Sequence, residues 1–199
     1  MSSRTGNVMS IDELIESAKN KVLELSKGEF DSLNQFSEKE KNEIALKIGI
    51  GAIKYAMLRL DRNQDLMFDL IEILDIKGNG SPYIQYAYAR MISILNKSKF
   101  NVRKIDLSKV KDINDDEKGL IKEILHFNEV VKLASNNFSP HLITTYLFNL
   151  CKMYSAFYEK HKILSDDENQ YLRLSITKVI SQIIKISMDV LGIEVMGKL

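Results

Sequence analysis

The sequence contains very little cysteine and proline, and it has no long apolar stretch. Cysteine occurs once in the 199 residues, at Cys151, so no disulfide bond can form within the chain. No segment approaches the roughly 20 consecutive apolar residues that a membrane-spanning helix needs. The polar residues 1–10 are not typical of a signal peptide. We therefore expect a cytoplasmic protein that does not enter a membrane.

The sequence also has no excess of positive or negative charge. It contains no recognisable catalytic motif. The chain has 28 basic and 27 acidic residues, with a net charge of +1, whereas many nucleic-acid-binding domains are strongly basic. The basic stretch at 99–111 is followed at once by the acidic stretch at 112–117, which is typical of a solvated linker. There is no phosphate-binding glycine loop, and His126, His141 and His161 are too scattered to suggest a metal site. A stand-alone helical enzyme therefore has the least support.

The apolar residues recur with the spacing of α-helices along nearly the whole chain. Two S-x-x-E capping boxes, at Ser10 and Ser37, and two Ser-Pro pairs predict the starts of helices. Gly49 and Gly51 lie inside one predicted helix, and we expect close helix packing there because glycine otherwise weakens a helix. No β-strand alternation or internal repeat is present, so the sequence predicts an all-α fold, a helical bundle.

One predicted helix carries an unusual set of aromatic side chains. Tyr83, Tyr86 and Arg90 fall at i, i+3 and i+7 and so share a face. Flat rings beside a guanidinium form a surface on which unpaired bases stack, and arginine also binds phosphate. The alternative places these tyrosines at the edge of the core, and the spacing alone favours it. A second aromatic cluster, formed by Tyr154, Phe157, Tyr158 and His161, leaves the same alternatives open, and periodicity alone favours packing on the bundle.

Five short motifs follow one another along the chain. They are MSSRTGNV at 1–8, IGIGAIKY at 48–55, GNGSPYIQYAYAR at 78–90, PHL at 140–142 and LGIE at 191–194. In this order and spacing they resemble the C-terminal part of arginyl-tRNA synthetases, which are class I aminoacyl-tRNA synthetases. The first motif is similar to the KMSKS-type ATP loop of that family, and the third is the most specific.

The resemblance implies a domain organisation and partners. Residues 1–36 would be a remnant of the signature loop with a linking helix, and residues 37–199 a DALR-type helical anticodon-binding domain. The implied partners are the anticodon stem-loop of arginine tRNA and the catalytic domain of the same enzyme, with the chain as a monomer. The whole enzyme would attach arginine to tRNA using ATP with Mg²⁺, whereas this part alone would hold no cofactor and be inactive. The alternative is a helical protein-interaction module without RNA binding, which the near-neutral charge favours.

The residues implied in binding form two groups. In a whole enzyme Ser2, Ser3 and Arg4 would contact ATP. The residues that we predict to contact tRNA are Tyr83, Gln85, Tyr86, Arg90, Phe157, His161 and Leu199. No catalytic residue and no metal ligand is expected in this part of the enzyme.

Overall fold

The computed structural model describes residues 9–65, 67–98, 110–165 and 169–199. Its elements are α1 (Ile11–Leu25), the 3₁₀ turn η1 (Asp31–Gln35), α2 (Glu38–Leu58), α3 (Leu70–Ile73), α4 (Ser81–Ser98), α5 (Asp115–Asn137), α6 (His141–Lys160) and α7 (Gln170–Val190). These residues contain no β-strand, which confirms the predicted all-α fold. No helix in the described ranges combines the length and hydrophobicity needed to cross a membrane. Ser2, Ser3 and Arg4 lie outside the described residues.

The first two long helices begin where their capping boxes predict. The Ser10 hydroxyl accepts from the Glu13 backbone N–H, while the Glu13 carboxylate accepts from the Ser10 N–H. Ser37 and Glu40 make the same reciprocal pair at the start of α2. These bonds satisfy N–H groups that have no partner within the helix. They also hold the pKa of both glutamates below its ordinary value.

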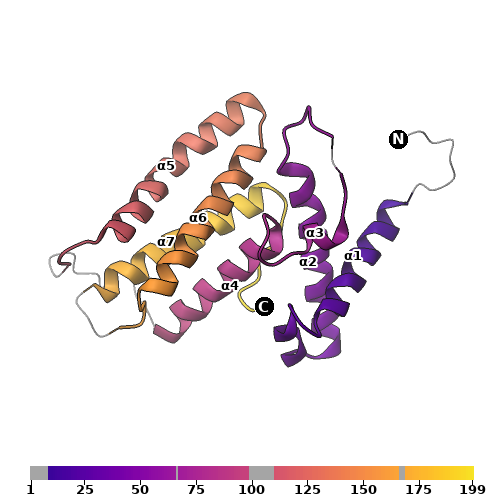
Figure 1. Cartoon of the computed structure of the whole chain (residues 1–199), viewed down its shortest axis with the longest axis horizontal. Coiled ribbons are helices and arrows are strands. Elements are labelled where there is room, and N and C mark those ends of the chain that lie inside the picture. Colours follow the sequence, from indigo (N-terminus) through magenta and orange to yellow (C-terminus); the bar gives the residue numbers. More distant parts are fainter. Residues whose placement is uncertain (1–8, 66, 99–109, 166–168) are drawn as a thin grey trace.

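The helices form two groups, each with its own apolar core. Figure 1 shows α4, α5, α6 and α7 side by side, while α1, α2 and the short α3 make up the other part. We call the core of the first four helices the C-terminal cluster; it also includes Tyr55 from α2. The core of α1, η1, α2 and α3 is the N-terminal cluster. The boundary predicted after residue 36 falls inside the N-terminal cluster, directly after η1.

Close approach of backbones explains the two glycines of α2. A Cβ at Gly49 would lie 3.1 Å from the backbone nitrogen of Lys19 in α1. A Cβ at Gly51 would lie 2.9 Å from Ser81 Oγ in α4 and 3.1 Å from Ile193 Cγ2. The predicted close packing is therefore confirmed, and α2 is the helix on which both clusters meet.

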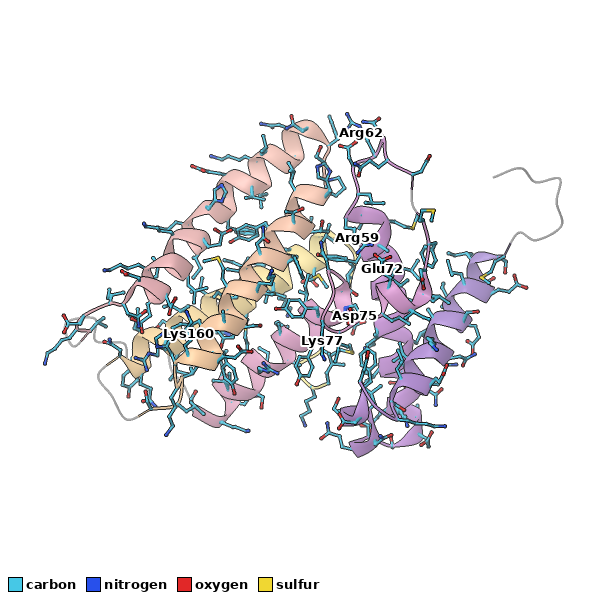
Figure 2. All side chains as sticks on the ribbon, in the orientation of Figure 1. Arg59, Arg62, Glu72, Asp75, Lys77 and Lys160 are labelled. Carbon is cyan, nitrogen blue, oxygen red and sulfur yellow. The ribbon has the colours of Figure 1, made fainter. Side chains whose placement is uncertain are left out.

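A polar network fastens the C-terminal end of α2 to the other group of helices. The Tyr55 hydroxyl lies 3.0 Å from the Thr144 carbonyl oxygen of α6 and 2.9 Å from Asn79 Oδ1. Arg59 donates to the Asn79 carbonyl at 2.8 Å and pairs with Glu72 at 2.6 Å, and Figure 2 shows these two charged side chains together. The loop that leads into α4 is thus held against α2.

The segment after α7 runs along the seam between the clusters. Gly192 has a φ of +67°, a left-handed conformation that suits glycine and ends α7. Gln85 then donates from Nε2 to the Glu194 carbonyl at 2.8 Å. Met196 and Leu199 pack against the N-terminal cluster. The chain therefore ends between α4 and the α1–α2 pair, as Figure 1 shows.

Candidate nucleic-acid interface

The outer face of α4 carries an arginine stacked between two tyrosines. The Arg90 guanidinium carbon lies 4.8 Å from the centre of the Tyr86 ring and 5.3 Å from that of Tyr158 in α6. Arg90 Nη2 also donates to the Tyr86 hydroxyl at 3.1 Å. The two rings remain 41% and 38% exposed, so aromatic surface is open to a ligand. We call these three residues the Tyr–Arg–Tyr stack.

On one side of this stack lies a hollow that we call the stacking groove. It has a volume of about 430 Å³ and is bounded by the stack, by Gln35 of η1 and by residues 197–199. Three of the predicted contact residues, Tyr86, Arg90 and Leu199, thus meet in one place. Both clusters contribute to the groove, because Gln35 and Leu199 belong to the N-terminal side of the seam.

The charge of the stacking groove differs from that of the whole chain. Its described lining includes the cations Arg90, Lys97 and Lys198 and no aspartate or glutamate side chain. A concentration of cations of this kind is what RNA phosphates require. The net charge of +1 therefore conceals a local positive site.

A second hollow, of about 400 Å³, lies on the other side of the stack. Its lining includes Tyr83, Ser155, Lys77 and Glu159 together with the stack itself, and Figure 2 shows Lys77 in the loop before α4. The Tyr83 hydroxyl is 3.2 Å from Ser155 Oγ, and its ring packs edge-on against Phe148 with 5.6 Å between centroids. Burial raises the pKa of Tyr83. Tyr83 thus combines a structural contact with a surface-lining position.

Gln85 and Phe157 occupy interior positions. They are 0% and 2% exposed, and Gln85 uses its amide to hold the Glu194 carbonyl. His161 caps the end of α6, with its ring 4.9 Å from that of Phe157 and Nε2 2.9 Å from Asp116 Oδ2. This hydrogen bond holds the pKa of Asp116 below its ordinary value. Gln85 and Phe157 therefore lie beneath the surface. The Nε2 atom of His161 already has a hydrogen-bond partner in Asp116.

Several residues of the groove are not among those predicted from the sequence. Tyr158 belongs to the second aromatic cluster of the sequence but is not among the predicted tRNA contacts, although its offset from the buried Phe157 is a signal that it faces outward. Gln35 lies in a 3₁₀ turn, and Lys198 lies in the extended tail, where no periodicity exists. Their position at one surface becomes visible only in the assembled groove.

The described residues contain no cluster of three or more potential metal ligands. The single thiol, Cys151, is fully buried, and burial raises its pKa to about 12, so it is not a nucleophile at neutral pH.

Comparison with known proteins matches two family models to different parts of the chain. Residues 84–199 match the DALR anticodon binding domain, and residues 1–70 match the catalytic domain of class I (R) tRNA synthetases. The chain is 35% identical to the arginine–tRNA ligase of Clostridium beijerinckii, over all of this chain and 34% of that protein. It is 37% identical to that of Flavobacterium psychrophilum, over 98% of this chain and 32% of that protein. The chain spans about a third of the length of these relatives.

Solved structures give the same result for the fold. The Thermus thermophilus arginyl-tRNA synthetase superposes with a TM-score of 0.84 at 26% identity, covering 98% of this chain and 33% of that one. The Plasmodium falciparum arginyl-tRNA synthetase gives 0.78 at 29% identity, covering 94% and 32%. The predicted resemblance to arginyl-tRNA synthetases is confirmed. Because the first family match covers more than half of the residues, the chain belongs to the family of the DALR anticodon binding domain.

Proposed function

We propose that the chain binds the anticodon stem-loop of arginine tRNA, as the anticodon-binding part of an arginine–tRNA ligase. The observation that carries this proposal is the Tyr–Arg–Tyr stack at the wall of a cation-lined groove. Proteins recognise unpaired RNA bases by stacking them on aromatic rings or guanidinium planes. Family membership supports an anticodon loop as the source of those bases.

The two hollows on either side of the stack suggest how the loop is held. One unpaired base would stack in the groove beside Tyr86, and a neighbouring base would lie in the hollow beside Tyr83. Lys97 and Lys198 on one side and Lys77 on the other would contact phosphates. Each stacked base contributes about 1–3 kcal/mol in comparable systems. Splaying the loop over the stack would therefore give both affinity and a fixed orientation.

The rest of the reaction belongs to the whole ligase. That enzyme would use ATP with Mg²⁺ to attach arginine to the tRNA in the cytoplasm, and Ser2, Ser3 and Arg4 would contact ATP there. The match of residues 1–70 to a catalytic-domain model supports this assignment. The described residues would position the tRNA rather than carry out chemistry.

A helical protein-interaction module without RNA binding is the less favoured function. The near-neutral net charge supports such a module, but the cations of the stacking groove support RNA. The two functions predict different responses to salt. RNA binding through phosphates weakens as salt rises, whereas binding through apolar contacts does not.

The test is binding of the chain to a short RNA hairpin that carries the anticodon stem and loop of arginine tRNA, measured by fluorescence anisotropy at several salt concentrations. Three phosphate contacts in a single-stranded loop predict a log–log salt slope of about −2. A hairpin with an altered loop should bind more weakly. Absence of binding, or equal and salt-insensitive binding of both hairpins, rejects the proposed function.

A further inference from the structure

The far wall of the stacking groove is formed by Gln35, which η1 holds in place. Leu33 of the same turn is fully buried in the N-terminal cluster. Asn34 donates from Nδ2 to the Ser26 carbonyl at 2.7 Å and accepts from Lys41 Nζ at 2.8 Å. The residues just before Gln35 are therefore anchored in the core and on both neighbouring segments. Gln35 is displayed at the groove by a rigid support.

The side chain of Gln35 is free to bind a ligand. It is exposed, and its amide makes no hydrogen bond to any of the described residues. A glutamine amide offers two donor hydrogens and one acceptor oxygen side by side. The cations Arg90, Lys97 and Lys198 can only donate, so they can pair with phosphates or with acceptor groups of a base, whereas Gln35 can also accept from a base. Gln35 and the exposed Ser93 are the neutral aliphatic polar side chains of the described groove lining.

We propose that Gln35 reads the hydrogen-bonding edge of one unpaired base that is stacked against the Tyr–Arg–Tyr stack in the stacking groove. The proposal rests on the proposed function, since it takes the ligand to be an RNA loop. An unpaired base presents adjacent donors and acceptors on its edges, which an amide can pair with in a bidentate manner. Specificity at one loop position would then come from residue 35, which lies outside the segment 84–199 that matches the anticodon-binding model.

Two substitutions separate reading of a base from support of the fold. Gln35→Leu removes the donors and the acceptor but keeps a side chain of similar size. Gln35→Glu removes the donors, so that the side chain can only accept hydrogen bonds. Because the amide has no partner among the described residues, both variants should keep the helical content and melting temperature of the parent chain. Gln182→Leu is the matched control, since Gln182 is an exposed glutamine of α7 that does not line the groove.

The experiment measures dissociation constants of the full chain and the three variants for a set of hairpins, each changed at a single loop base. The parent chain should lose affinity on the order of tenfold when the base at one position is changed, as one bidentate contact predicts. Gln35→Leu should bind the preferred hairpin about tenfold more weakly and lose discrimination at that position alone. Gln35→Glu should shift the preference there toward a base edge that only donates. Gln182→Leu should behave like the parent chain.

Four other outcomes would overturn the reading role of Gln35. If Gln35→Leu discriminates at every position as the parent does, Gln35 does not read a base, while the proposed function stands. A uniform loss of affinity with discrimination intact also overturns the role, because it indicates a contact to the RNA backbone. Binding by the parent chain without any discrimination overturns it as well. Failure of the parent chain to bind any hairpin rejects the proposed function and this proposal together.

Discussion

Two of the hollows among the described residues are nearly equal in size but opposite in charge. The stacking groove has a volume of about 430 Å³ and is lined by three cations and by no aspartate or glutamate side chain. A hollow of about 450 Å³ between α5 and α6, which we call the acidic groove, is lined by Glu123 and Glu129 and by no lysine or arginine. Both statements concern the described lining residues. Size alone does not separate these two sites, but their charge does.

The two grooves also differ in what their tyrosines offer. Tyr146 lines the acidic groove but is only 4% exposed, and its hydroxyl donates to the Glu123 carbonyl at 2.9 Å. Tyr86 and Tyr158 of the stacking groove keep about two fifths of their surface exposed. An aromatic side chain can therefore stack on a ligand only where its ring is not already covered by the apolar core. A near-zero net charge thus coexists with two grooves of opposite local charge.

The largest effect on RNA binding is expected from Arg90→Ala. It removes both a charge-assisted contact and a stacking plane, so hairpin affinity should fall by about 2–3 kcal/mol. Arg90→Lys should recover only part of this loss because lysine keeps the charge without the flat surface. Arg62→Ala is the control, since Arg62 donates to the Asn137 carbonyl at 3.1 Å, away from both grooves. Equal losses for Arg62→Ala and Arg90→Ala would show that general charge, and not the stack, determines affinity.

Tyr86→Ala should weaken hairpin binding by about 1–3 kcal/mol, the range for loss of one stacked base. Tyr86→Phe keeps the ring and should bind nearly as well as the parent chain. Tyr171→Ala provides the comparison, because Tyr171 is 48% exposed on α7 and lines neither groove. Isothermal titration with the same hairpin measures all three variants. If Tyr171→Ala loses as much affinity as Tyr86→Ala, the RNA does not bind at the stack.

Gln85→Leu should act on stability first. The substitution leaves the Glu194 carbonyl unpaired and loosens the tail, so the free energy of unfolding should fall by about 1–2 kcal/mol. Hairpin affinity should fall only a few-fold, because Lys198 and Leu199 lose their fixed position. Urea unfolding followed by circular dichroism measures the first effect. A large loss of RNA affinity with unchanged stability would instead indicate direct contact between Gln85 and the RNA.

The smallest effect is expected in the acidic groove. Glu129→Gln should change hairpin affinity by less than about 0.5 kcal/mol, the range for surface substitutions away from special features. Lys198→Gln in the stacking groove should instead make the salt slope shallower by about 0.7, the value for one phosphate of a single strand. If the two variants change hairpin affinity by similar amounts in opposite directions, the net charge of the protein determines RNA binding, and the two grooves do not differ in their contribution.

Much of the fold follows from local sequence. The capping boxes at Ser10 and Ser37 fixed two helix starts, and the glycines of α2 indicated close packing, because each depends on neighbours in sequence or on backbone size. The motif at 78–90 identified the family, but its identity did not reveal which side chains face outward. Gln85 illustrates this limit. It lies inside the most specific motif, yet its side chain is fully buried and its amide donates to the Glu194 carbonyl of the tail.

The sequence by itself determined that the chain is a bundle of helices and which family it resembles. Helix periodicity, capping boxes and motifs depend only on residues that are close together in the sequence. Only the tertiary structure decided where the proposed binding surface lies. The stacking groove joins Gln35, the Tyr–Arg–Tyr stack and Lys198, which come from η1, α4, α6 and the tail. These segments meet only because the two apolar clusters dock along α2 and the tail passes between them. No local pattern encodes a site whose walls are brought together by that docking.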